Sequence, residues 1–199
     1  MFAVVLLSAR ATAQNPNADS AAVHFVQGMM HHHAQAIVMA EMVPSHSARS
    51  DLKTAARRII VSQTDEIAMM RRWLEKHHAE VPAIDTNPPD TMSHSMSMDM
   101  GGMRMSPTSP MMPGMLTHDQ LLRLARSRRA SFDSLFLASM IAHHEGALKM
   151  VADLFAVPGA TDDGELFQMA SDMDSDQRAE IARMRSMQTK HLPKTRSHP

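Results

Sequence analysis

Apolar residues recur at three- and four-residue steps along most of the chain, the spacing that places them on one face of an α-helix. The pattern predicts four helices, over residues 19–43, 50–77, 119–156 and 162–189. Pro44 ends the first helix, and Thr117 with Gln120 has the spacing of a capping box that would start the third. Few β-branched or aromatic residues remain to build strands. The chain is therefore predicted to be all-α.

Two blocks of sequence occur twice along the chain. Residues 25–39 recur 111 positions later as residues 136–150, and the Phe, two Met and two adjacent His coincide. Residues 63–71, which contain Gln-x-x-Glu-Ile-Ala, recur 114 positions later as residues 177–185. The chain is therefore predicted to be a duplicated helical hairpin. Four amphipathic helices with two short loops and one long connection predict a four-helix bundle.

The predicted domains follow from this repeat. The first hairpin spans residues 19–78 and the second spans residues 117–190, followed by a disordered tail over residues 191–199. Residues 79–116 between the hairpins are rich in Pro and Gly, which predicts a flexible linker without helix or strand.

The N-terminal residues 1–13 resemble the end of a signal peptide. A short apolar run precedes Ala11-Thr12-Ala13, which has the form of a cleavage site, although the usual basic start is missing and indicates truncation. The run is too short to cross a bilayer. We therefore expect a periplasmic or secreted protein with no membrane span in the mature chain.

Composition narrows the chemistry. The chain has 22 Met and 13 His but no Cys, which excludes disulfides, thiolate metal sites and cysteine nucleophiles. Its net charge is −1, so no bulk positive field attracts nucleic acid.

Many of the methionines lie in the predicted linker, where there is no apolar core to fill. Thioether sulfur is a soft ligand that suits Cu(I) and Ag(I), and it needs no deprotonation. We therefore predict a metal-capturing segment rather than neutral low-complexity sequence. Its predicted ligands are Met92, His94, Met96, Met98, Met100, Met103 and Met105.

The repeated Met-x-x-His-His block is the second candidate metal site. Residues three or four apart share a helix face, so Met29 lies over His32 and His33, and Met140 lies over His143 and His144. Adjacent residues differ by about 100° in direction, which predicts one inward and one rim histidine in each pair.

Other repeated residues are predicted to complete or support this site. Met39 and Met150 are either further ligands or core packing. An antiparallel partner helix would bring up Gln63, Glu66, Met70, Gln177, Glu180 and Met184 as supporting residues. His31 has no repeated counterpart and is at most an opportunistic ligand. The other histidines without a repeated partner are predicted to lie at the surface: His24, His46, His77, His78, His191 and His198.

The Met-x-x-His-His block followed by Gln-x-x-Glu-Ile-Ala-x-Met resembles domain-of-unknown-function family 305, over residues 20–76 and 131–188. The second copy is the closer match, whereas the first copy has Gln35 where the second has Gly146. Members of this family are ferritin-like helical proteins, and some are exported bacterial copper-binding proteins. The resemblance implies a ferritin-like fold and a tendency to bind metal.

These observations predict an exported metal-binding protein for metal tolerance or delivery. Met would bind Cu(I) or Ag(I), His would bind Cu(II), and a copper-transport or efflux protein would be its partner. One alternative is a ferritin-like metal-dependent oxidoreductase. Di-iron proteins of that kind need Glu-x-x-His motifs on two helices, and Glu41, Glu66, Glu145 and Glu180 are not followed by His three positions later. The chain also lacks zinc-hydrolase and nucleophile motifs, so no enzyme activity is predicted. A second alternative is a helical partner-binding module whose methionines form an adaptable apolar surface.

Overall fold

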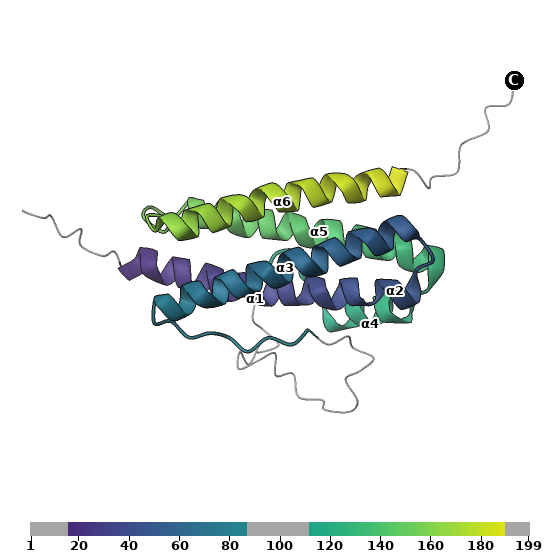
Figure 1. Cartoon of the computed structure of the whole chain (residues 1–199), viewed down its shortest axis with the longest axis horizontal. Coiled ribbons are helices and arrows are strands. Elements are labelled where there is room, and N and C mark those ends of the chain that lie inside the picture. Colours follow the sequence, from purple (N-terminus) through teal and green to yellow (C-terminus); the bar gives the residue numbers. More distant parts are fainter. Residues whose placement is uncertain (1–15, 87–111, 190–199) are drawn as a thin grey trace, which may run out of the picture.

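The computed structural model describes residues 16–86 and 112–189 (Figure 1). Within these ranges all regular secondary structure is helical, which confirms the predicted all-α class. The helices are α1 (Pro16–Glu41), α2 (Val43–His46), α3 (Ser50–Lys76), α4 (His118–Arg126), α5 (Arg129–Phe155) and α6 (Gly164–Thr189). The predicted signal peptide (residues 1–13), the tail (191–199) and the linker ligands Met92, His94, Met96, Met98, Met100, Met103 and Met105 lie outside the described residues.

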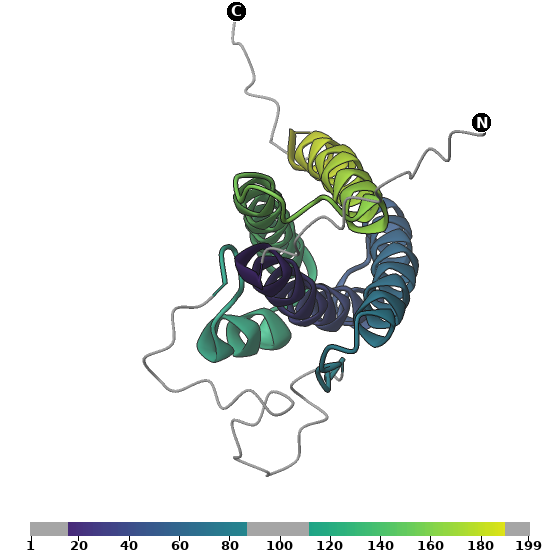
Figure 2. The same cartoon turned by 90° about the vertical axis from the view of Figure 1, so that its left-hand side faces the viewer.

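Four long helices pack side by side, as Figures 1 and 2 show. Helix α1 contacts α3, its neighbour in the first hairpin, and α5; helix α6 contacts α5 and, less extensively, α3. The two hairpins therefore meet mainly through α1 and α5, and less extensively through α3 and α6. None of the described helices is long and apolar enough to cross a membrane.

The third predicted helix is interrupted, which corrects the expectation of one helix over residues 119–156. Helix α4 begins with the predicted capping box of Thr117 and Gln120 but ends at Arg126. The carbonyls that would continue it are taken by side chains: Ser127 Oγ donates to Leu124 O at 2.6 Å, and Arg128 donates to Ala125 O. Such local side-chain bonds compete with the helix ladder. A new helix, α5, then starts at Arg129, whose φ is +54°.

The interior contains two apolar clusters at different levels of the helices. One cluster includes Met39 of α1, Ile59 of α3, Phe136 of α5 and Ile181 of α6. The other includes Met29 of α1, Met70 of α3, Val151 of α5 and Met173 of α6. Each long helix carries buried polar residues between its contributions to the two clusters. We call this set the polar layer; it consists of His32, His33, Gln63, Glu66, His143, His144, Gln177 and Glu180.

The last residues of the predicted linker pack on the helices rather than hanging free. We call residues 112–116 the strap. Leu116 is buried in the apolar core. Its amide donates to Gln35 Oε1 at 2.7 Å, and Gln35 Nε2 donates to Leu116 O at 2.9 Å. The strap is therefore tied to α1. At its centre Gly114 has φ +78°, a left-handed conformation that favours glycine.

Candidate metal centre

Both histidines of each repeated pair are buried, which corrects the prediction of one inward and one rim histidine. His32, His33, His143 and His144 are all at most 1% exposed. The reason is that α1 and α5 each have two neighbours. Adjacent residues point about 100° apart, so one histidine faces the other hairpin and the next faces the partner helix of its own hairpin. The ring centroids of His32 and His143 lie 3.8 Å apart across the α1–α5 contact.

The second histidine of each pair is held by a glutamate on the partner helix. His33 Nε2 forms a hydrogen-bonded pair with Glu66 Oε2, and His144 Nε2 lies 2.6 Å from Glu180 Oε2. Both pairs are buried. The expected supporting role of Glu66 and Glu180 thus has a geometric basis, since carboxylates commonly orient imidazole ligands in this way.

The hydrogen bonds fix which ring nitrogen carries the proton. A carbonyl or carboxylate oxygen can only accept, so a neutral imidazole that meets one must donate from that nitrogen. His32 Nε2 lies 2.9 Å from Pro113 O, and the Nε2 atoms of His33 and His144 face glutamates. In their neutral forms all three rings therefore carry the lone pair on Nδ1, the nitrogen then able to bind a metal.

Several atoms in the polar layer are buried without a hydrogen-bond partner. Three of them are the Nδ1 atoms just described, of His32, His33 and His144. The others are His143 Nε2, Gln63 Oε1 and Nε2, and Gln177 Oε1. An unpaired buried polar atom costs free energy, and native proteins have few of them. This group of unpaired ring nitrogens has the donor chemistry that a borderline or soft metal ion requires.

The electrostatics of the layer keep two of its histidines neutral. Burial lowers the pKa of His32 to about 3, against a smaller opposing effect of the hydrogen bond to Pro113. Burial also lowers the pKa of His143 well below its usual value, and neighbouring His32 and His144 add to this. Both rings are therefore neutral at neutral pH, with a proton on one nitrogen only, which is the form that binds metal.

The predicted methionine ligands and supports fall in the two apolar clusters beside the polar layer. Met29, Met39, Met70, Met140 and Met184 are at most 1% exposed, and Met150 is half-buried. Met29 and Met70 belong to one cluster, whereas Met39, Met140 and Met184 belong to the other. Each Met-x-x-His-His copy therefore sends its methionine to a different side of the layer.

No group of three or more His, Asp or Glu side chains among the described residues is arranged to hold a metal ion by itself. Imidazole and carboxylate ligands alone thus do not form a complete site in this conformation. Because thioethers flank the layer on both sides, sulfur is the natural further ligand for a soft ion.

Histidines outside the layer depart from the predicted surface positions in two cases. His46 is buried, where its Nε2 donates to Ala125 O at 2.9 Å. It therefore joins the end of α2 to α4, a contact that helical periodicity does not reveal. His31 is also buried, and burial lowers its pKa. In contrast, His24, His77 and His78 are exposed as predicted, whereas His191 and His198 lie outside the described residues.

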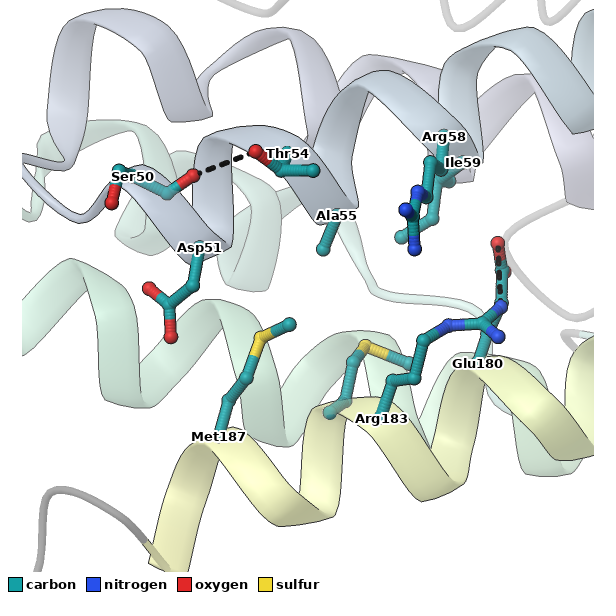
Figure 3. A pocket seen from close by; sticks show the side chains of 10 residues that line it. Ser50, Asp51, Thr54, Ala55, Arg58, Ile59, Glu180, Arg183 and Met187 are labelled. Atoms are coloured by element: carbon teal, nitrogen blue, oxygen red, sulfur yellow. Dashed lines mark hydrogen bonds and ion pairs between the residues drawn. The ribbon is translucent and has the colours of Figure 1, made fainter.

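Two grooves lie between α3 and α6. One, of about 310 Å³, is lined by Glu180, Arg58, Arg183 and Met187 among others, and Figure 3 shows these side chains. The other, of about 260 Å³, is lined by Glu66, Met69, Met169, Asp172, Met173, Ser175 and Asp176. Glu180 and Glu66, the partners of His144 and His33, thus each also line a groove. Arginines line the Glu180 groove, whereas the charged residues of the Glu66 groove are all acidic. Burial and then nearby carboxylates, Glu66 first, raise the pKa of Asp176 in the acidic groove.

Sequence reasoning missed the residues that contact the strap. Gln35, Pro113 and Gly146 were not predicted as site residues, yet Pro113 bonds His32 and Gln35 holds the strap in place. The available signal was the position where the two repeats disagree, Gln35 against Gly146. Its meaning depends on which surface the strap covers, and that is a tertiary feature.

Comparison with known proteins places the chain among solved helical structures. A protein of Streptomyces coelicolor from the family DUF305 is 26% identical with a TM-score of 0.66, over 87% of this chain and 94% of that one. A comparison with curated proteins found no match.

A second set of similar structures belongs to a protein named CopM. Its Cu(I)-bound form is 27% identical with a TM-score of 0.60, over 86% of this chain and 98% of that one. Its Cu(II)-bound form is 27% identical with a TM-score of 0.62, over 86% and 97% respectively. Residues 22–188 of the present chain match the family described as Domain of unknown function (DUF305). The chain therefore belongs to the DUF305 family.

Proposed function

We propose that this protein is an exported copper-binding protein that serves metal tolerance or delivery. In this proposal Met sulfur binds Cu(I) or Ag(I), and the histidines of the polar layer bind Cu(II). The four long helices would form a ferritin-like four-helix bundle that encloses the ion. A copper-transport or efflux protein would deliver or receive it.

The observation that carries this proposal is the set of buried, unpaired ring nitrogens contributed by both repeats. Three imidazoles are oriented by acceptors so that Nδ1 is free, and His143 adds an unpaired Nε2. A layer built only for stability would pair these atoms or replace them with apolar groups, because leaving them unpaired is costly. Binding of a cation would offset that cost.

The structural relatives support copper as the metal. CopM has Cu(I)-bound and Cu(II)-bound forms at 27% identity to this chain. The composition agrees, since thioether and imidazole are present in quantity and thiolate is absent. Export is supported by the N-terminal sequence, and it suits a soft-metal site made from Met rather than from oxidisable Cys.

We propose binding rather than catalysis, because each candidate enzyme class lacks its signature residues. Di-iron sites require Glu-x-x-His on two helices, and among the glutamates of the described helices only Glu75, at the end of α3, is followed by His three positions later. The third interpretation, a partner-binding module with a Met surface, is weakened by the burial of the helical methionines: only Met69 is an exposed large hydrophobic Met among the described residues.

Metal competition on the purified full chain tests the proposal. Without a His tag, the protein should compete with a calibrated Cu(I) chelator and should bind Ag(I), and both far more tightly than Zn²⁺. His143→Ala together with His144→Ala should remove most Cu(II) binding, while His24→Ala with His78→Ala, at exposed positions, should not. Preferential binding of Zn²⁺, or Cu(II) binding unaffected by the His143 and His144 substitutions, would contradict the proposal.

A further inference from the structure

The two repeats differ at the aligned position that is Gln35 in the first repeat and Gly146 in the second. These two residues contact the strap from two different helices. In the first repeat, Gln35 of α1 makes two hydrogen bonds to the backbone of Leu116. In the second repeat, the equivalent residue is Gly146 of α5. A Cβ atom there would overlap the carbonyl of Pro113 and lie 2.8 Å from Gly114 Cα. Helix α1 therefore binds the strap through the side chain of Gln35, whereas helix α5 has no side chain at the point where the strap packs against it.

The strap consequently covers α1 and α5 at the level of the facing histidines. Pro113 O accepts a hydrogen bond from His32 Nε2. Gly114 lies against the backbone of α5, since a Cβ on it would overlap Ala142 O and lie 2.9 Å from His143 Cα. Only one of the two facing rings is bonded to the strap: His143 Nε2 is buried without a partner. The strap thus makes the two repeats unequal at their point of contact.

We propose that Gln35 is a positioning residue for the metal centre. By holding Leu116 it keeps the Pro113 carbonyl against His32, and it thereby commits His32 to the form that is protonated on Nε2 and free on Nδ1. The inference rests on the proposed copper-binding function and assigns the two repeats different ligand atoms, Nδ1 of His32 and Nε2 of His143.

Gln35 would act as residues that support metal ligands do in other proteins. A ligand imidazole is oriented by what its second nitrogen bonds, and loss of such a partner typically costs about 10- to 100-fold in metal affinity. For His33 and His144 the partner is a helix carboxylate. For His32 the partner is a backbone carbonyl in a loop, so its position depends on what anchors that loop. Gln35 is the side chain that provides the anchor.

Four variants separate positioning from general stability. Gln35→Ala removes both bonds to Leu116. Gln35→Glu keeps the acceptor for the Leu116 amide but loses the donor, so it should give partial rescue. Gly146→Ala displaces the strap from the α5 side without touching Gln35. The matched control is Gln27→Ala: Gln27 is also on α1 and also bonds a linker carbonyl, Glu80 O at 2.8 Å, but not the strap.

The experiment is ¹⁵N NMR of the histidine side chains in the metal-free protein, together with Cu(II) affinity measured by chelator competition. In the unaltered protein and in Gln27→Ala, we expect metal-free His32 to be protonated on Nε2 and Cu(II) to bind with the same affinity. In Gln35→Ala and Gly146→Ala, we expect mixed protonation of His32 and roughly tenfold weaker Cu(II) binding.

Two failures of the experiment are distinguishable. If the unaltered protein does not bind Cu(II), the proposed binding by the polar layer falls and the inference falls with it. If the unaltered protein binds Cu(II) but Gln35→Ala keeps the same affinity and the same His32 nitrogen signals, the inference alone is overturned. The metal-free spectrum of His32 reports on positioning in either case.

Discussion

Glu66 and Glu180 each connect a buried histidine to a groove at the surface. Each accepts a hydrogen bond in the polar layer, and each also lines one of the two grooves between α3 and α6. The residues around them differ in charge. Glu66 shares its groove with Asp172 and Asp176, whereas Glu180 shares its groove with Asp51, Arg58 and Arg183. The charged residues that line the Glu66 groove are therefore all acidic and attract a cation, whereas in the Glu180 groove two arginines offset two carboxylates.

Substitution of these carboxylates should weaken copper binding. Glu66→Gln keeps the shape but removes the charged acceptor that orients His33, so we expect Cu(II) affinity to fall about tenfold or more. Glu180→Gln should act in the same way on His144. Competition titration with a calibrated Cu(II) chelator measures this. The control is Glu145→Gln, an exposed residue paired with Arg185 at 2.5 Å, which should leave affinity unchanged; equal losses at all three positions would refute a specific role.

Gly146 offers a stability test of the strap contact that does not involve metal. Alanine at this position overlaps Pro113 backbone, and backbone cannot move aside as a flexible side chain can. We expect Gly146→Ala to lower the free energy of unfolding by about 1–3 kcal/mol. Gly164→Ala is the matched control, because a Cβ there meets nothing within 4 Å. It should leave stability unchanged or raise it by up to about 1 kcal/mol. Denaturant unfolding of both variants makes the comparison.

At the residue scale, the sequence identified the residues of the polar layer, but it did not predict their burial or their contacts. The repeat identified all eight members of the polar layer. It did not predict that both histidines of a pair are buried, because burial depends on how many helices surround α1 and α5. The paired roles of Glu66 and Glu180 were anticipated only as support, since the contact with His33 or His144 joins two helices that are distant in sequence.

At the scale of elements, periodicity predicted the long helices because each carries apolar residues at both cluster levels. It failed where side chains compete for backbone groups, as Ser127 and Arg128 do at the end of α4. It also assigned residues 112–116 wholly to a flexible linker. Those residues contain Pro, Gly and Met, which locally favour irregular structure, and their packing depends on Gln35 and Gly146 on two different helices.

The Met-rich segment between residue 86 and the strap is predicted to bind soft metal ions, and this prediction can be tested by replacing its methionines. We propose a variant in which its seven methionines become Ser: Met92, Met96, Met98, Met100, Met103, Met105 and Met111. The strap and helices are unchanged, so we expect the melting transition to be retained, with stability altered by no more than about 0.5 kcal/mol. The number of Cu(I) or Ag(I) ions bound per chain should fall, because soft thioether ligands are lost.

The result of that substitution separates two locations for the soft-metal ligands. Cu(II) binding by the polar layer should be retained in the seven-Ser variant. As a comparison, the same seven positions changed to Leu keep apolar character but lose sulfur, and they should lose the same metal equivalents. If either variant keeps the full Cu(I) stoichiometry, the segment is not a capture site and the soft ligands lie elsewhere.

At the scale of the whole molecule, a polar layer lies between two apolar clusters. The apolar clusters supply the burial that holds the four long helices together. The layer between them leaves several ring nitrogens and amide atoms unpaired, and each such atom costs about 1–3 kcal/mol. Departures of this kind from the rules of stable packing are expected where function requires them. The stability contributed by the layer therefore depends on the protonation of its histidines.

Acid should destabilise the fold through the buried histidines. Burial lowers the pKa of His32 to about 3 and that of His143 well below its usual value, whereas both titrate near 6.5 when unfolded. As pH falls below about 6.5, the unfolded chain binds protons that these folded rings do not. Stability is therefore complete above that pH and is lost progressively below it. By pH 5 the His32 ring should cost about 2 kcal/mol, at roughly 1.4 kcal/mol per pH unit, and the His143 ring adds to the loss in the same direction.

Substituting one ring isolates its share of this loss. His143→Gln removes one titrating group from the layer, so the stability difference between pH 7.5 and pH 5 should be smaller than in the unaltered protein. His118→Gln, at an exposed position, should leave the difference unchanged. Comparing each variant with itself at two pH values cancels any general destabilisation by the substitution, and carboxylates titrate mostly below this window. Chemical denaturation of metal-free protein at both pH values gives the measurement. An undiminished pH dependence in His143→Gln would mean that this ring is protonated, or free to leave the layer, in the folded protein at pH 5.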